Sequence, residues 1–337
     1  LRHHYGNAAI DIQGGEPTIY PGIEELCAHC ASLGLLPTLI TNAVALSVRA
    51  AGQRLKDSGV RDLLVSVHGL GTNYDDVVGV PGAHKKQMAA LDNCLAVGLP
   101  VRFNCVLTRS ALPHLAGVAR LAADLGARVV NFIAFNPFED QQKGERSKDD
   151  VAAYGEVAPP LVAALDILAA AGIEANVRYF PLCQMPEAYR PHLYNFQQLP
   201  YDIHEWDYAS WSWTDMQPQR RRDGDLSPRI SLRQANLRSP LFRDVPGYLD
   251  DPALTVEDTY RHSALIRARE HCGYVFAPAC RDCGAREICD GFHGDYAAFF
   301  GLDEARSIET TTLLTDPRHY INRQRKIVET EDADWAL

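Results

Sequence analysis

The feature that most constrains this fold is a regular alternation of short apolar runs and amphipathic stretches over the first 180 residues. Each apolar run precedes a stretch with apolar residues at three- and four-residue spacing, which is typical of a helix. The runs expected to be strands are 8–13, 36–41, 62–67, 101–107, 128–134 and 175–180. The stretches expected to be helices lie near 21–34, 44–58, 83–97, 112–125 and 150–172. Such alternation predicts a parallel sheet covered by helices.

Polar residues follow several of these runs where the strands are expected to end. They are Gln13 to Glu16, Thr41 and Asn42, Ser66 and His68, Asn104, and Asn136 before Pro137. The carboxyl edge of a parallel sheet is where α/β barrels and open α/β sheets bind ligands. A doubly wound nucleotide-binding fold is the competing architecture, but no Gly-x-Gly-x-x-Gly follows the first run and no Walker phosphate loop occurs.

Composition excludes several classes of protein. With 46% hydrophobic and 23% charged residues, the chain can bury a core. A net charge of −10 argues against general nucleic-acid binding, which needs a basic surface. The sequence has no run of 18 apolar residues and no visible signal peptide, so we expect neither a membrane span nor secretion.

The cysteines divide into two groups. Five of the nine are scattered, and four lie close together near the C-terminus: Cys272, Cys280, Cys283 and Cys289. The compact part, Cys280-x2-Cys283-x5-Cys289, can hold a soft metal or an iron–sulfur cluster. We therefore expect a reduced, cytoplasmic protein with one metal site.

A diglycine turn directly follows the first apolar run. Gly14 and Gly15 permit close approach of the backbone to a ligand, and Glu16 adds a carboxylate that can accept hydrogen bonds from a cation. Pro17 then fixes the exit of the turn, and an amphipathic stretch opens after Tyr20.

With these surroundings, the chain resembles the radical S-adenosylmethionine (radical SAM) superfamily. The segment AIDIQGGEPTIYPGIEELCAHCASLGLLPTLITN resembles that family's second and third βα units. VSVHGLGTNYDDVVGVPGAHKKQMAALDNCLAVGLPVRFNCVLT resembles its fourth and fifth. The resemblance covers roughly residues 8–140 and implies a partial (βα)6 barrel of the TIM type.

The resemblance also implies roles for residues at the strand ends. Gly14, Gly15, Glu16 and Pro17 match the motif that accepts hydrogen bonds from the ammonium of SAM. Thr41, Asn42, Ser66, His68 and Asn104 match later strand ends, at positions that often contact the ribose or carboxylate of SAM. For Ser66 and His68, a plain hydrogen-bonding role at the end of the strand is the alternative.

One part of the family pattern is missing. The Cys-x3-Cys-x2-Cys loop that holds the radical-generating cluster should precede the diglycine turn, and residues 1–13 contain no cysteine. Because the chain starts at Leu1 almost directly on a strand, we expect the loop and the first strand to belong to a preceding segment. The chain as given is then expected not to generate radicals.

The C-terminal cysteines resemble the auxiliary-cluster domain, SPASM or its shorter twitch form, that follows many radical SAM barrels. The position of the next SPASM cysteine is occupied by His293, which favours one auxiliary 4Fe–4S cluster. Its fourth ligand could be Cys183, Cys272 or His293, and we favour Cys183. Structural zinc with the same ligands is the competing interpretation.

The expected organisation has three parts: a barrel over 1–180, an aromatic and loop-rich extension over 181–256, and the auxiliary domain with a tail over 257–337. The resemblance implies an oxidoreductase or transferase that cleaves SAM to a 5′-deoxyadenosyl radical and abstracts hydrogen from a peptide or small molecule. It also implies a reducing partner such as flavodoxin or ferredoxin. The alternatives are a non-catalytic iron–sulfur or zinc scaffold and a methyltransferase of ordinary polar mechanism.

Overall fold

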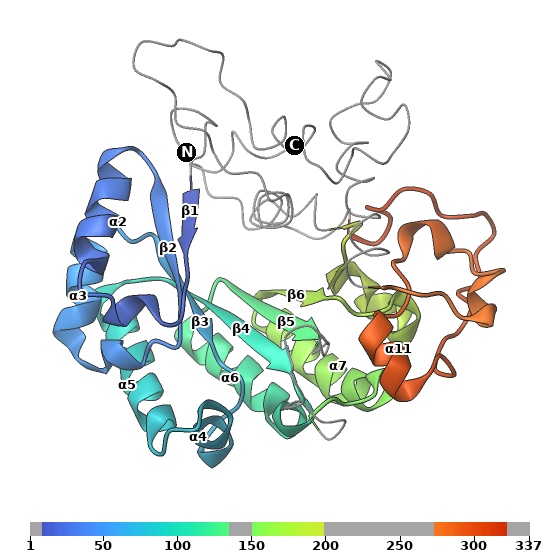
Figure 1. Ribbon diagram of the computed structural model, residues 1–337, viewed down its shortest axis with the longest axis horizontal. Helices are drawn as coiled ribbons and strands as arrows, with labels where there is room; N and C mark the ends of the chain where they lie inside the picture. The colour runs from blue at the N-terminus through green and yellow to red at the C-terminus, as the bar shows by residue number, and fades with distance from the viewer. Residues whose placement is uncertain (1–8, 135–149, 199–272, 322–337) are drawn as a thin grey trace, which may run out of the picture.

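The computed structural model describes residues 9–134, 150–198 and 273–321. Its centre is one sheet of seven strands in which every neighbouring pair is parallel (Figure 1). The strands are β1(Ala9–Ile12), β2(Leu36–Thr41), β3(Asp62–Ser66), β4(Val101–Leu107), β5(Val129–Ala134), β6(Glu174–Arg178) and β7(Leu193–Tyr194).

The order of the strands in the sheet is the order of the strands in the chain. A doubly wound sheet reverses its strand order at a switch point, and this sheet has no reversal. Sequential parallel strands joined by right-handed crossovers wind in one direction, as in a βα barrel. The sheet is therefore a partial barrel, as predicted. The short strand β7, which pairs with β6 through Leu193 and Tyr194, was not expected.

Helices cover one face of the sheet (Figure 1). They are α2(Ile23–Ser32), α3(Arg49–Asp57), α4(Thr72–Val78), α5(Ala83–Val97), α6(Leu115–Leu125) and α7(Tyr154–Ala170). All except α4 coincide with expected helices. Five glycines that follow these helices have the positive φ of left-handed caps: Gly34, Gly59, Gly98, Gly126 and Gly172.

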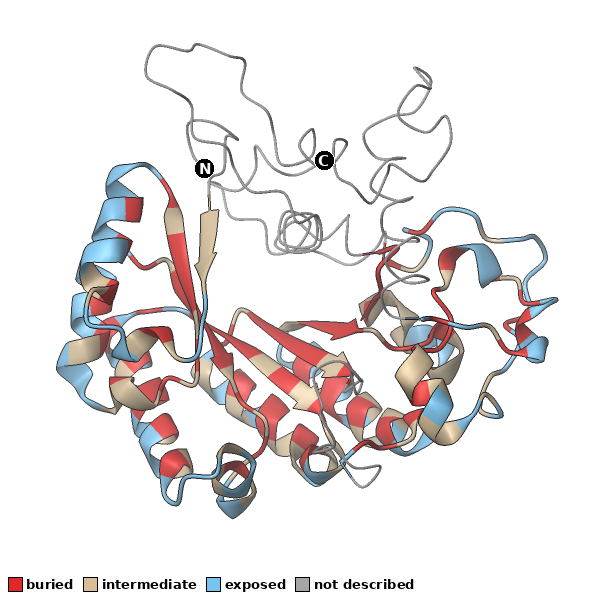
Figure 2. Ribbon diagram, in the orientation of Figure 1, coloured by how far each residue is buried: buried red, intermediate tan, exposed pale blue. Residues whose placement is uncertain are grey.

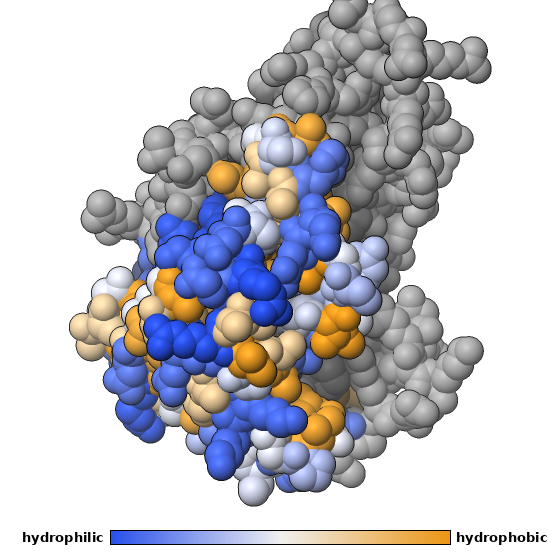
Figure 3. Space-filling model, turned by 90° about the vertical axis from the view of Figure 1, so that its left-hand side faces the viewer, coloured by the Kyte–Doolittle hydropathy of each residue, from blue (hydrophilic) through white to orange (hydrophobic). Residues whose placement is uncertain are grey.

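Strand side chains alternate between the two faces of the sheet. Those that face the helices form the apolar core, including Val65, Phe103 and Val130. Figure 2 shows this buried layer of strands and inner helix faces with exposed residues outside it. On the side where α2 and α3 lie, Figure 3 shows a mostly hydrophilic surface with scattered apolar residues. These helices are thus amphipathic, as their periodicity predicts.

The amino end of the sheet is held by a buried charge cluster. Asp62 is 1% exposed, accepts a hydrogen bond from the Thr38 hydroxyl at 2.6 Å, and pairs with Arg102 at 3.1 Å. Burial alone would raise the pKa of Asp62, but Arg102 and Arg61 outweigh it and hold that pKa below its ordinary value. This cluster stabilises the end of the barrel opposite the edge where ligands bind.

Residues 273–321 pack against the last part of the barrel. The rings of Tyr154 in α7 and Tyr296 in α11(Gly294–Phe300) stack with centroids 3.9 Å apart, and the Tyr154 N–H donates to the Tyr296 hydroxyl at 2.8 Å. The Phe196 N–H donates to the Asp290 carboxylate at 2.6 Å. The sheet itself extends to Tyr194, past the boundary expected at residue 180.

Some expectations fall on residues outside the described ranges. These are the pair Asn136-Pro137, most of the aromatic extension and Cys272. Within the described ranges, no helix combines the length and apolarity that a bilayer crossing requires.

Candidate functional site

Glu16 ties the diglycine turn to the end of the neighbouring strand β2. Its Oε2 accepts a hydrogen bond from the Asn42 N–H at 2.8 Å, and its Oε1 accepts one from the Thr41 hydroxyl at 2.6 Å. Oε1 also accepts the N–H and the hydroxyl of Thr18 at 3.0 Å and 2.5 Å. Oε2 accepts one hydrogen bond in the described structure, and a carboxylate oxygen can accept at least two, so Oε2 can accept one further donor.

The two glycines before Glu16 leave open space. A Cβ added at Gly14 or Gly15 would meet no atom within 4 Å, and neither residue has a positive φ. Glycine is therefore not required here by backbone strain, and what it provides is access to the main chain. The turn and the start of α2 line a pocket of about 490 Å³, within the size range of small-molecule sites.

Gln87 of α5 connects the ends of β2 and β3. Its Nε2 has two hydrogens to donate and lies 2.9 Å from the carbonyl oxygens of both Asn42 and Ser66 and 2.8 Å from the Tyr74 hydroxyl oxygen. Burial raises the pKa of Tyr74 to about 12, with smaller contributions from Glu16 and Asp75, so the phenol stays neutral. The sequence interpretation missed Gln87. The available signal was one amide on the otherwise apolar face of its helix.

His68 fixes the end of β3 to β4. Its Nδ1 accepts a hydrogen bond from the Val106 N–H at 3.2 Å. Burial lowers the pKa of His68 to about 4, so the ring is neutral at pH 7 and its proton is on Nε2. His68 can therefore offer a neutral donor at this edge, but no positive charge.

A row of polar side chains crosses the sheet on the face opposite the helices. Ser66 pairs in register with Asn104, Asn104 with Asn131, and Asn131 with Asn176. The last two also meet through their side chains, because Asn176 Nδ2 donates to Asn131 Oδ1 at 3.1 Å. Residues in parallel register share a face, so these four side chains lie side by side. Sequence reasoning missed Asn131 and Asn176, each of which is a single asparagine inside an apolar run.

The structure thus brings the predicted strand-end residues to one edge. Those from Gly14 to Pro17 adjoin Thr41 and Asn42 directly, and Ser66 joins them through Gln87. Asn104 and His68 continue the same edge along β3 and β4. Their contacts with a ligand stay a prediction.

The second candidate site is a small cavity where the barrel meets the C-terminal segment. Cys183, Cys280, Cys283 and Cys289 all line it. The other lining residues are mainly apolar, with two arginines, Arg286 and Arg306. Cys183 comes from the segment after β6 and the other three come from one short stretch, so the cavity joins parts of the chain about 100 residues apart.

Three of the four sulfurs have nearby N–H donors. The Ile308 N–H donates to Cys283 Sγ at 3.3 Å, and the Gly291 N–H donates to Cys289 Sγ at 3.4 Å. The Gln184 side-chain amide donates to Cys183 Sγ at 3.4 Å. Hydrogen bonds to sulfur are among the contacts by which proteins tune iron–sulfur clusters, so these N–H donors fit such a group. The cavity itself has a volume of only about 10 Å³.

The sheet positions Cys183. Tyr179, just after β6, has a φ of 61°, a left-handed conformation that is rare for a bulky residue. The Asn195 side chain then holds both polar groups of Phe180, accepting from its N–H and donating to its carbonyl, each at 2.9 Å. The stretch that carries Cys183 is therefore fastened to the sheet at both of its ends.

Of the other two candidates for the fourth ligand, His293 lies elsewhere and Cys272 is outside the described residues. His293 does not line the cavity, and its Nδ1 accepts the Asp295 N–H at 3.2 Å at the start of α11. Burial lowers the pKa of His293 to about 4. Among the residues that the structure describes, no three His, Cys, Asp or Glu side chains form a group that could hold a single metal ion.

Comparison with known proteins relates mainly the first third of the chain to others. Residues 1–115 match the family model described as the Radical SAM superfamily. The PqqA peptide cyclase of Methylorubrum populi is 34% identical over 120 residues, which cover 35% of this chain and 31% of the relative. The AdoMet-dependent heme synthase of Oleidesulfovibrio alaskensis is 29% identical over 123 residues, covering 36% of this chain and 31% of the relative. The matched part thus spans about a third of these relatives.

Two solved structures are similar at low identity. Streptococcus suis SuiB bound to S-adenosylmethionine has 18% identity and a TM-score of 0.42, covering 50% of this chain and 39% of SuiB. Methylornithine synthase (PylB) has 15% identity and a TM-score of 0.40, covering 68% of this chain and 66% of PylB.

Proposed function

We propose that this chain, whose first 115 residues belong to the radical SAM superfamily, is part of an enzyme that binds SAM at the carboxyl edge of β1 to β4 and an auxiliary 4Fe–4S cluster between Cys183 and the C-terminal cysteines. One observation carries the proposal. The Glu16 carboxylate joins the diglycine turn to Thr41 and Asn42 within the matched region, beside a pocket of about 490 Å³.

The diglycine turn would hold the ammonium of SAM. An ammonium offers only donors, and the turn offers three acceptors for them: the carbonyls of Gly14 and Gly15 and the remaining position on Glu16 Oε2. Because Glu16 already accepts bonds from Thr18, Thr41 and Asn42, the carboxylate is held in place before a ligand arrives.

Ser66, His68 and Asn104 would contact the ribose and carboxylate of SAM. Ser66 and Asn104 are partly buried neighbours in register, and a hydroxyl and an amide can each donate or accept. His68 would donate through Nε2, because Nδ1 is occupied by Val106. Neutral donors suit SAM, because it carries both positively and negatively charged groups.

Cys183, Cys280, Cys283 and Cys289 would ligate the auxiliary cluster. Four thiols around one cavity, with N–H donors to three of the sulfurs, support Cys183 over His293 as the fourth ligand. Arg286 lines the same cavity and would offset negative charge on a thiolate-bound cluster.

In this superfamily, a second cluster reduces SAM and supplies a 5′-deoxyadenosyl radical that abstracts hydrogen from a substrate. The sequence contains no Cys-x3-Cys-x2-Cys spacing for that cluster, so these residues are assigned no part in the reductive step. We propose a peptide or small-molecule substrate, the peptide being suggested by the name of the 34% identical relative. Flavodoxin or ferredoxin would be the reductant.

Two binding measurements on the anaerobically reconstituted chain test this proposal. SAM should bind about 100-fold more tightly than 5′-methylthioadenosine, which lacks the amino-acid part, since charge-assisted hydrogen bonds contribute about 1.5–3 kcal/mol each. Equal affinities would remove the role of the diglycine turn.

Metal and sulfide content tests the second site. We expect about four irons and four sulfides per chain from one cluster. One zinc and no sulfide would instead support the zinc scaffold.

A further inference from the structure

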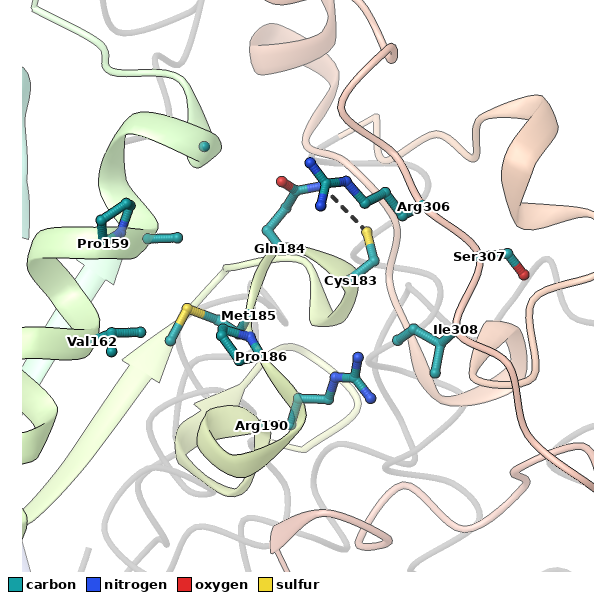
Figure 4. A pocket seen from close by; sticks show the side chains of 12 residues that line it. Pro159, Val162, Cys183, Gln184, Met185, Pro186, Arg190, Arg306, Ser307 and Ile308 are labelled. Carbon is teal, nitrogen blue, oxygen red and sulfur yellow. Dashed lines mark hydrogen bonds between the residues drawn. The ribbon is translucent and has the colours of Figure 1, made fainter.

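A second pocket lies on the other side of Cys183, between α7 and the C-terminal segment (Figure 4). Its volume is about 560 Å³, in the range of pockets that hold small molecules. Arg306 enters it from the C-terminal segment and Arg190 from the segment after β6. It contains no residue of the diglycine turn, so it is separate from the proposed SAM site.

The charge of this pocket is one-sided. Arg190 and Arg306 line it, and no carboxylate is among the described residues that line it. Arg190 donates to the Leu182 carbonyl and the Tyr320 hydroxyl, each at 3.2 Å, both of which are neutral acceptors. Neither arginine has an ion pair with a carboxylate among the described residues. In a chain of net charge −10, two guanidiniums facing one pocket without a counterion indicate a place for an anion.

The carboxylate of Glu304, two residues before Arg306, is already engaged. Glu304 Oε1 accepts the Gly155 N–H at 2.9 Å, and Oε2 accepts the Tyr296 hydroxyl. Its carboxylate is therefore held toward the start of α7 and α11 and is not among the residues that line the pocket.

Much of the remaining lining is apolar, although Gln184 and Ser307 also contribute. The apolar part includes Ala158, Pro159 and Val162 of α7. Met185 and Pro186 lie beside Val162 (Figure 4). A simple hydrated ion would leave this apolar lining in contact with water, whereas a ligand with an apolar body would cover it.

We propose that this pocket binds an amphipathic anion, a small molecule with an apolar body and one carboxylate, phosphate or sulfonate group. The arginines would hold the anionic group, and the α7 wall would hold the body. SAM is a poor occupant, because its sulfonium and ammonium give it a net positive charge that two arginines repel. Cys183 lines both this pocket and the cysteine cavity, so a bound anion would lie beside its sulfur.

Fluorescence titration of the reconstituted chain with 8-anilinonaphthalene-1-sulfonate tests the proposal, because this probe combines an apolar body with one anionic group. We expect one site per chain, and displacement by octanoate at a concentration at least tenfold lower than by octan-1-ol. R306Q should weaken probe binding about tenfold, which corresponds to about 1.4 kcal/mol.

The matched control is R281Q, which removes an exposed arginine of the same segment that does not line the pocket. R281Q should leave binding unchanged within twofold. Equal weakening by R281Q and R306Q, no weakening by R306Q, or equal displacement by octan-1-ol and octanoate would each overturn the proposal.

V162W separates loss of the pocket from loss of the fold. Its indole would fill the pocket from α7, away from the C-terminal cysteines, so probe binding should fall while the circular dichroism spectrum and iron content stay unchanged. Retained probe binding in V162W overturns the proposal even if R306Q proves unstable. Iron content reports on the proposed cluster separately, so the failure of one proposal is distinguishable from the failure of the other.

Discussion

The two candidate sites are completed in different ways. At the diglycine turn, Glu16 already has hydrogen-bond donors from Thr18, Thr41 and Asn42, and these residues lie within 26 positions of one another. In the cysteine cavity, the sulfurs come from residue 183 and from residues 280–289, and the described residues include no disulfide between them. The first site is held together by hydrogen bonds within the protein. The second brings together thiols, which as thiolates are ligands for soft metals.

This difference teaches where binding energy and folding energy are coupled. A site that is already hydrogen-bonded gains little stability from its ligand beyond mass action. A site made of clustered thiols from distant segments gains the free energy of metal binding as folding free energy. The changes below should therefore affect the two regions independently, because they lie at separate places on the sheet.

The largest effect is expected from Cys183→Ala. Loss of one of four cysteine ligands should remove the cluster, so iron should fall from about four per chain to below one. Iron analysis after anaerobic reconstitution measures this. SAM affinity should stay within twofold of the unchanged chain.

Cys94→Ala is the matched control, because Cys94 is fully buried in α5 and does not line the cavity. It should cost some stability and no iron. Retention of four irons by Cys183→Ala would transfer the fourth-ligand role to another residue.

The next largest effect is expected from Glu16→Gln. The amide replaces one accepting oxygen with a donor, which then faces the N–H of Asn42 or the hydroxyl of Thr41. We expect SAM affinity to fall on the order of 100-fold and the chain to lose about 2 kcal/mol of stability. Calorimetric titration and urea unfolding measure the two quantities.

Glu24→Gln provides a comparison at an exposed carboxylate of α2 that pairs with Arg54 at 2.6 Å. Because exposed ion pairs contribute little, its SAM affinity should be unchanged. An unchanged affinity in Glu16→Gln as well would disprove the role of the carboxylate.

A smaller effect concerns pH. The pKa of His68 is lowered to about 4 in the folded chain, against 6.5 for an ordinary histidine. The unfolded chain therefore binds a proton first as pH falls below 6.5, and stability should decrease from there to about pH 4. The loss attributable to His68 should be about 2 kcal/mol at pH 5 relative to pH 8.

Urea unfolding of the unchanged chain and of His68→Asn across this range isolates that contribution, because His293 titrates in both. The variant should show the shallower decrease. Parallel pH profiles would mean that His68 is not held neutral in the folded chain.

The smallest effect is expected from Gln87→Met, which keeps the length of the side chain and removes its donor. The Asn42 and Ser66 carbonyls would each lose a hydrogen bond, at a cost of about 1–2 kcal/mol in stability. SAM affinity should fall only a few fold, because Gln87 acts through the strand ends. Asn93 lies on the same helix as Gln87 and donates to the carbonyls of Leu46 and Ser47. Asn93→Met, which removes these bonds, should leave SAM affinity unchanged.

Most of the barrel could be predicted because its signals are local. The strands β2 and β4 and the helix α5 have the bounds that apolar periodicity predicts. α4 was missed because its seven residues lie between Gly71 and Gly79, so the segment has the composition of a loop. β7 was missed because two residues are too short for any periodicity.

The site residues that could be predicted are likewise those whose signals are local in the sequence. The strand-end residues could be predicted because parallel strands bring their carboxyl ends together whatever their helices do. Gln87 could not be predicted, because its contacts depend on how α5 rotates against the sheet. The choice of Cys183 over His293 also needed coordinates, since spacing in the sequence does not say which of two distant residues faces a cavity.

Asn195 has a consequence for how the two halves of the chain can vary. Its side chain makes two hydrogen bonds to the backbone of Phe180. The residues just before Cys183 are therefore fixed to the barrel and are not a free linker to the C-terminal segment. A cluster ligated by Cys183 would then be bound to the barrel through that residue. The later cysteines would supply its other three ligands from the C-terminal segment. In evolution, the C-terminal segment could be replaced by another segment with three cysteines, while the barrel and its carboxyl edge stayed unaltered.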